Sequence, residues 1–236
     1  MYKGIYLALS GAVLKERQLE VISQNLSNAN TNGYKKDKIA FRDYLIQQHN
    51  GLNEDQQGKS MADMAEVITD YTPGAFKQTG NNLDIAIDGS GFIQLEHDQY
   101  SRRGDLKLDS EGYLTTNSGA RVQGAKGDIK LSGSNVQITG NGEVFVDGGA
   151  TDKINIVDFE NPKTIRKVGE GIFVSDEPGI PSKSIVQQGF LETSNVSAIK
   201  EMVTMISSMR EFESFQKTIQ AFDEAASHGI NEVGRL

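Results

Sequence analysis

Apolar residues near the start of this chain recur at heptad spacing, in alternating steps of three and four residues. Such a repeat is typical of a helix that pairs with another helix, because it keeps one apolar edge facing the partner. The repeat covers about three heptads, the shortest length at which the pattern is informative, and only the slot at Lys15 and Glu16 is polar. The residues of this predicted coiled-coil seam are Ile5, Leu9, Ala12, Leu19, Ile22 and Leu26.

The repeat stops at a polar segment, residues 25–34, which reads NLSNANTNGY. Its Asn, Ser and Thr side chains compete with the helix for backbone hydrogen bonds, and an Asn-Gly pair suits a helix cap or a turn. Two interpretations stay open: a simple helix stop, or a junction that positions the helix against neighbouring subunits, with Tyr34 as an anchor. The candidate residues of this segment are Asn28, Asn30, Gly33 and Tyr34.

A second long helical pattern lies at the opposite end of the chain, over residues 199–226, and His228-Gly229 is expected to close it. Its apolar sector is wide enough to contact more than one neighbour. Both terminal helices are predicted to be roughly 25–30 residues long, about 40–45 Å, and their partners are either each other or other subunits. The stripe consists of Met202, Met205, Met209, Phe212, Ile219 and Ala226, flanked by Ile199, Val203 and Ile206.

From Asn82 onward the apolar pattern changes to period 2, which indicates half-buried strands. Short strands then recur every 8–12 residues between turn sequences, as in an antiparallel all-β body. The chain has 25 Gly and only 4 Pro, in keeping with many tight turns. The sequence therefore predicts an α+β fold: a discontinuous coiled-coil-like helical domain (1–34 and 195–236), a connecting segment (35–75) with a flexible loop at 47–60, and an inserted antiparallel all-β domain (76–194).

Charge and composition exclude several classes of protein. The net charge is −8, although residues 1–45 carry seven Lys or Arg against four Asp or Glu. The remaining acidic body is poorly suited to nucleic acid, whose binding depends on phosphate neutralisation. The absence of Cys excludes disulfides and cysteine-based metal sites. No apolar run approaches the ~18 residues of a membrane span, and we expect no cleaved secretory signal peptide.

No residue pattern points clearly to catalysis, a cofactor or a metal. Asp84, Asp88, Asp105 and Asp109 could supply the acid pair of a glycosidase, which keeps open a rival hypothesis, a secreted β-rich enzyme acting on cell-wall glycan. However, Asp88 and Asp109 stand in turn sequences, where Asp bonds its own backbone. The expected protein is therefore not an enzyme.

Four collinear segments resemble the axial proteins of the bacterial flagellum, in particular the basal-body rod proteins. Residues 25–35 are similar to the N-terminal signature of that family, and residues 83–92 and 100–114 to the segments that open its β domain. The run from Gly189 to Val196, with Arg210, Glu211, Phe212, Glu213 and Lys217, resembles the C-terminal signature. Residues 5–12 and the short length look more like the proximal-rod type, FlgF, than the distal-rod type, FlgG.

The resemblance implies a structural subunit without cofactors that assembles helically through its terminal helices and transmits torque. Its implied partners are copies of itself, other rod proteins and the flagellar type III export apparatus, with no nucleic acid, membrane insertion or small-molecule substrate. The implied location is the periplasmic rod. Within the family, the FlgG-type distal rod subunit is the alternative.

Overall fold

A computed structural model of the chain describes residues 2–41, 65–133 and 135–233. The predicted loop at 47–60 lies outside these residues. The chain divides into two compact units. Unit 1 comprises residues 1–27, 37–68 and 197–236, and unit 2 comprises residues 28–36 and 69–196.

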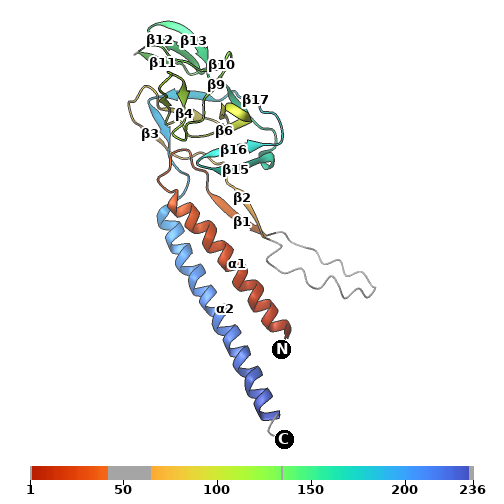
Figure 1. The fold of residues 1–236 in the computed structure, drawn as a ribbon. Coiled ribbons are helices and arrows are strands. Elements are labelled where there is room, and N and C mark those ends of the chain that lie inside the picture. The colour runs from red at the N-terminus through yellow and green to blue at the C-terminus, as the bar shows by residue number, and fades with distance from the viewer. Residues whose placement is uncertain (1, 42–64, 134, 234–236) are drawn as a thin grey trace. The chain divides into compact units, whose positions relative to one another are not determined.

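Two long helices form most of unit 1, α1 (Tyr2–Ser27) and α2 (Ala198–Val233). They run antiparallel and side by side (Figure 1). The first bond of α2 joins the Glu201 N–H to the Ser197 carbonyl at 3.0 Å, which makes Ser197 the N-cap. The predicted closure of this helix at His228-Gly229 was wrong, because α2 continues to Val233. A single glycine costs a helix only about 1 kcal/mol, and helix-compatible residues follow it here.

Unit 1 also contains a two-stranded sheet, β1 (Asp37–Phe41) with β2 (Ala65–Thr69). The buried side chain of Asn25 links the last turns of α1 to β1. Its amide Nδ2 donates to the Asp37 carbonyl at 2.8 Å, and its Oδ1 accepts from the Asp37 N–H at 2.9 Å. Asn25 therefore binds the backbone of β1 as a neighbouring strand would. Neither helix, within the described residues, is apolar over enough of its length to cross a bilayer.

Unit 2 is built from short antiparallel strands and two 3₁₀ turns. Its six-stranded sheet has the order β15-β16-β6-β5-β14-β17, beside a three-stranded meander, β11-β12-β13, and four two-stranded pairs, β3-β19, β4-β18, β7-β8 and β9-β10. Their bounds are β3 Phe76–Gln78, β4 Ile85–Asp88, β5 Phe92–Leu95, η3 Glu96–Asp98, β6 Gln99–Ser101, β7 Lys107–Leu108, β8 Leu114–Thr115, β9 Gln123–Gly124, β10 Gly127–Asp128, β11 Val136–Ile138, β12 Glu143–Val146, β13 Gly149–Lys153, β14 Ile156–Asp158, η4 Pro162–Thr164, β15 Ile165–Gly169, β16 Ile172–Ser175, β17 Ile180–Pro181, β18 Ile185–Gln188 and β19 Phe190–Glu192.

Strand β5 separates two cores of unit 2, and it is buried on both faces. Ile93 and Leu95 enter an aliphatic core, whereas Phe92 enters an aromatic core. In the aromatic core the Phe92 and Phe173 rings meet at 66° with centroids 5.3 Å apart, a favourable edge-to-face geometry. The aliphatic core also contains Ile85, Ile87, Leu106, Leu114, Val122, Ile129, Leu131, Val136, Ile138, Val144, Ile154 and Val186.

The α+β class, the two terminal helices and the antiparallel strands are confirmed. Several predicted strands are present with bounds that shift by one or two residues. The missed strands are mostly polar or glycine-containing, such as β9 (QG), β10 (GD) and β13 (GATDK), so no apolar alternation marks them. Backbone pairing within the sheet places these segments, not their own side chains.

Candidate functional site

The Asn-rich segment after α1 forms a turn that binds the end of β19, within unit 2. The turn itself is made by the Thr31 N–H to the Asn28 carbonyl at 3.1 Å and the Tyr34 N–H to the Thr31 carbonyl at 3.3 Å. Gly33 then donates its N–H to the Glu192 carbonyl at 2.7 Å. The segment is therefore more than a helix stop, because it contacts the residues that precede α2.

Gly33 occupies a position that only glycine fits. Its φ is +65°, and a Cβ at this position would lie 2.5 Å from the Arg102 carbonyl oxygen. A side chain would meet both the steric cost of the left-handed conformation and a backbone that cannot move aside. This explains why the predicted junction residue is a glycine.

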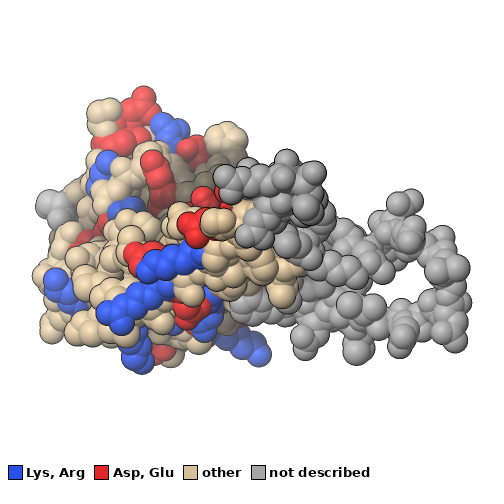
Figure 2. Space-filling view, turned by 90° about the horizontal axis from the view of Figure 1, so that it is seen from below, with Lys and Arg blue, Asp and Glu red and all other residues tan. Residues whose placement is uncertain are grey.

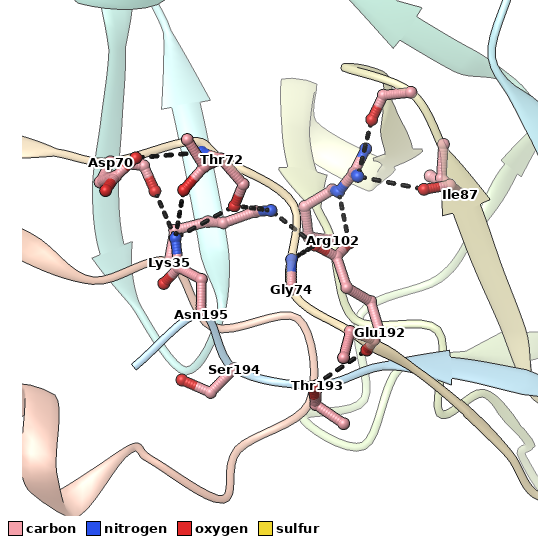
Figure 3. A network of polar contacts seen from close by, with 12 residues as sticks. Lys35, Asp70, Thr72, Gly74, Ile87, Arg102, Glu192, Thr193, Ser194 and Asn195 are labelled. Atoms are coloured by element: carbon pink, nitrogen blue, oxygen red, sulfur yellow. Dashed lines mark hydrogen bonds and ion pairs between the residues drawn. The ribbon is translucent and has the colours of Figure 1, made fainter. Parts of the chain in front are cut away.

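Next to Gly33 lies a buried ion cluster of Lys35, Arg102 and Glu192 (Figure 3). The Lys35 Nζ lies 2.6 Å from Glu192 Oε1, and the Arg102 Nε lies 2.8 Å from Glu192 Oε2. These side chains are 1%, 2% and 1% exposed for Lys35, Arg102 and Glu192. Two cations therefore share one carboxylate away from water.

Backbone groups complete the coordination of all three charges. Glu192 Oε1 also accepts the Gly74 N–H at 2.8 Å, and the Lys35 Nζ donates to the Thr72 carbonyl at 3.0 Å. The Arg102 guanidinium donates to the carbonyls of Ile87, Gly89 and Gly91. Among the described residues, no buried side-chain polar atom lacks a hydrogen-bond partner.

Burial lowers the pKa of Lys35, and the nearby Arg102 charge lowers it further, whereas Glu192 and Asp70 raise it. Such a cluster adds little net stability, because desolvation offsets the attraction between the charges. Removing one partner is costly, since the remaining charge stays buried and unpaired. The cluster therefore specifies one arrangement of its three chain segments.

Asn195 extends this centre to the residues just before α2. Its Oδ1 accepts the Lys36 N–H at 2.7 Å, and its Nδ2 donates to the carbonyls of Asp70 at 2.8 Å and Thr72 at 3.0 Å (Figure 3). Lys167 adds a bond to the Lys35 carbonyl at 2.6 Å and lies 4.2 Å from the Tyr34 ring centroid. Residues 33–36, 70–74 and 192–195 are thus fastened together, although the sequence separates them widely.

The pairing face of α1 in unit 1 differs from the predicted seam by one position. The least exposed residues follow steps of four and three, and two of them are glycines. An added Cβ at Gly4 would lie 2.9 Å from the Phe222 ring, and one at Gly11 would lie 2.6 Å from the Phe215 ring. The Lys15 Nζ pairs with a Glu211 carboxylate oxygen at 2.5 Å. Along α1 this face consists of Gly4, Ala8, Gly11, Lys15, Gln18, Ile22 and Asn25.

On α2 the least exposed residues also alternate in steps of four and three. Phe215 and Phe222 lie against the glycines of α1, so large rings on one helix fill spaces left by small residues on the other. The face consists of Glu201, Met205, Ser208, Phe212, Phe215, Ile219, Phe222 and Ala226. It includes the predicted residues Met205, Phe212 and Ile219.

The other predicted interface residues lie in several environments. Ala12 and Ile22 are buried, and Ile5, Leu19 and Leu26 are half-buried. In the Asn-rich segment, Gly33 and Tyr34 are buried, Asn28 is half-buried and Asn30 is exposed. Exposed side chains are those of Leu9, Ile199, Met202 and Met209.

Sequence reasoning missed the residues that hold the site together. The pairing residues Gly4, Gly11, Phe215 and Phe222 do not fit a search for large apolar residues on one heptad. The ion cluster gives no local signal, because its members are separated by 67 and 90 positions in the chain. Lys35 and Glu192 did stand in the two quoted terminal segments, which was the only available hint.

The four carboxylates considered for catalysis have structural partners. Asp109 accepts the N–H groups of Glu111 and Tyr113, each at 2.8 Å, as expected of a turn residue. The Tyr113 N–H bond is the main cause of the lowered pKa of Asp109. Asp105 pairs with Arg103 at 2.7 Å, Asp84 accepts from Asn81 at 2.9 Å, and Asp88 accepts from Gln187 at 3.3 Å.

Surface charge does not suggest a nucleic-acid partner either. On the face shown in Figure 2, basic and acidic side chains are interspersed. The chain as a whole carries a net charge of −8. Such a surface has no broad basic area of the kind that phosphate binding uses.

Three family profiles match successive parts of the chain. Residues 5–35 match "Flagella basal body rod protein", residues 86–146 match "Flagellar hook protein FlgE/F/G D1 domain", and residues 187–232 match "Flagellar basal body rod FlgEFG protein C-terminal". The first and third profiles include the segments fastened at the ion cluster. Together the matches define the class, the rod and hook proteins of the bacterial flagellum.

Curated relatives narrow this class. The chain is 31% identical to the flagellar basal-body rod protein FlgG of Agrobacterium fabrum, over 95% of the chain and 97% of that protein. It is 29% identical to FlgG of Bacillus subtilis, over 98% and 99%, and 26% identical to the rod protein FlgF of Caulobacter vibrioides, over the full length of both. The chain belongs to the flagellar basal-body rod protein family and is a structural subunit of the rod.

Proposed function

We propose that this chain is an FlgF-type subunit of the proximal rod, which assembles helically with copies of itself and other rod proteins through its terminal helices and transmits torque. The observation that carries this proposal is the exposure of α2. Among residues 198–228, only Ser208 is buried. A helix that leaves so many large apolar side chains in water is suited to contacts with other subunits.

The proposed assembly unit is the discontinuous helical domain of residues 1–34 and 195–236, acting as a coiled-coil-like pair. The β domain of residues 76–194 is inserted between its halves, and residues 35–75 connect them. The alternating four-and-three spacing on both pairing faces supports this arrangement. We further propose that the subunit is exported by the flagellar type III apparatus without cleavage and acts in the periplasm.

The length of the chain favours the FlgF type. The alignment with B. subtilis FlgG runs over 265 positions, although this chain has only 236 residues, whereas the alignment with C. vibrioides FlgF runs over 245 positions and covers both chains fully. The FlgG type remains the second candidate, because FlgG relatives from B. subtilis and A. fabrum are more identical to the chain.

Copy number in isolated basal bodies distinguishes the two types. For an FlgF-type subunit we expect deletion of the gene to abolish swimming, and a short ring of few copies per basal body. Quantitative mass spectrometry of purified basal bodies, with labelled reference peptides, measures this number. A protein present in many copies, or one whose purified form polymerises into long rods, would instead be of the FlgG type.

The exposed helices also predict the behaviour of the soluble chain before assembly. Since the helix pair buries few side chains completely, it should open readily, and proteases cut the open form. Limited trypsin digestion read by mass spectrometry should trim both terminal helices first and leave a resistant fragment within residues 69–196. A monomeric chain whose helices resist as long as this fragment would contradict the expectation.

A further inference from the structure

Two groups of exposed apolar side chains lie on the helix pair of unit 1. The α1 outer patch consists of Tyr6, Leu7 and Leu9, which are 70%, 59% and 49% exposed. The α2 outer patch consists of Ile199, Met202, Val203, Ile206 and Met209, each between 50% and 77% exposed. Neither patch is used by the pairing of α1 with α2.

The two patches face away from the pairing interface on different helices. At 3.6 residues per turn, Tyr6 and Leu9 lie on the side of α1 opposite Ala8 and Gly11, and Leu7 borders that side. By the same geometry, Ile199, Val203 and Ile206 lie on the side of α2 opposite the pairing face, and Met202 and Met209 border it. The patches therefore occupy opposite sides of the helix pair.

The patches also lie at opposite ends of the pair. Gly4 lies beside Phe222 and Gly11 beside Phe215, so the level of Leu9 on α1 corresponds to about Lys217 on α2. Val203 is 14 positions nearer the start of α2 than Lys217. At 1.5 Å per residue, this separates the patches by ~21 Å along the pair.

Charged residues occupy the outward faces between the patches. Glu16, Arg17 and Glu20 are exposed on α1 after the first patch, and Arg210, Glu213 and Lys217 are exposed on α2 after the second. If two copies met side by side in register, Leu9 would face Lys217 and Val203 would face the level of Glu20. Such a contact would desolvate charges and leave both apolar patches poorly matched.

From these positions we infer that the α2 outer patch of one copy receives the α1 outer patch of a second copy of this chain, displaced by ~21 Å along the helix axis. Patches on opposite sides and at opposite ends make the contact heterologous, so each copy keeps one free patch of each kind. A displaced heterologous contact does not close, and it propagates as a helix. The inference rests on the proposed assembly through the terminal helices, and it specifies the surface and the displacement.

Cysteine cross-linking tests the contact without background, because the chain has no Cys. We expect the double variant Leu9→Cys with Val203→Cys to form disulfide-linked dimers and longer ladders in oxidised basal bodies on non-reducing gels. Within one chain these sites are ~21 Å apart along the pair, far beyond the ~7 Å limit between Cα atoms for a disulfide. Any bond must therefore join two copies.

The matched control is Leu9→Cys with Lys217→Cys, which reports side-by-side contact in register. Cross-linking of this control but not of the Leu9–Val203 pair overturns the displaced contact, and so does the presence of both variants in basal bodies with no cross-link from either. Bonds from Val203→Cys to a different rod protein identify that protein as the occupant and overturn the second copy. If the unaltered chain is missing from basal bodies, the proposed function itself fails.

A charge pair covers the case in which the cysteine variants do not enter the rod. Leu9→Glu and Val203→Lys should each reduce swimming on soft agar, because each buries an unpaired charge at the contact. Combined in one chain, the two changes place opposite charges at the same contact and should restore at least half of the swimming rate. A double variant that swims no better than the worse single variant contradicts the inference.

Discussion

Replacing Glu192 with Gln is expected to destabilise unit 2 by about 3–5 kcal/mol, the usual cost of removing one partner from a buried ion pair. The variant would keep the shape of the side chain but leave the Lys35 ammonium and the Arg102 guanidinium buried together. Urea denaturation of the full chain measures the loss. Tyrosine fluorescence is a suitable signal, since the chain has seven Tyr and no Trp, and Tyr71 and Tyr100 pack with the aromatic core.

Two further variants make this expectation specific. Glu111→Gln removes a comparable contact with Arg121, at 3.0 Å, but the Glu111 side chain is 63% exposed, so the loss should stay below about 1 kcal/mol. Lys35→Met should cost less than Glu192→Gln, because the Arg102–Glu192 pair then remains balanced. If Lys35→Met were the more damaging change, the cluster would be held by the lysine contacts and not by the shared carboxylate.

The sequence predicted the elements better than their contacts. Heptad spacing located both terminal helices, and period-2 alternation located strands such as β5 and β11, because both signals depend on local burial. The pairing face was misplaced since the search favoured large apolar side chains. Gly4, Ala8 and Gly11 face α2, whereas Leu9 faces away. A sequence pattern does not distinguish apolar residues that meet their own chain from those available to a neighbour.

The candidate site was predictable only in part. The Asn-rich turn, Gly33 and Tyr34 were identified because turn chemistry is local. The carboxylate that completes the junction comes from β19 and the guanidinium from the residue after β6, and only the sheet topology brings them to Lys35. Their meeting depends on long-range strand pairing, which no short-range pattern encodes.

Replacing Gly11 with Leu is expected to abolish swimming while leaving unit 2 folded. Helix propensity alone predicts the opposite, since Leu favours a helix over Gly by nearly 1 kcal/mol. However, even a single Cβ at Gly11 would lie 2.6 Å from two atoms of the Phe215 ring, so a Leu side chain must push the two helices apart. Swimming on soft agar measures assembly, and urea denaturation confirms that unit 2 is intact.

The reciprocal variant distinguishes a local clash from a general effect of the larger side chain. Phe215→Ala alone should weaken swimming by removing the ring that fills the space beside Gly11. Combined with Gly11→Leu, it should restore swimming above either single variant, because the leucine then occupies the volume that the ring left. Equal loss in the double variant would mean that Gly11 is required for a contact outside the helix pair, and that the pairing face of α1 is shared with another subunit.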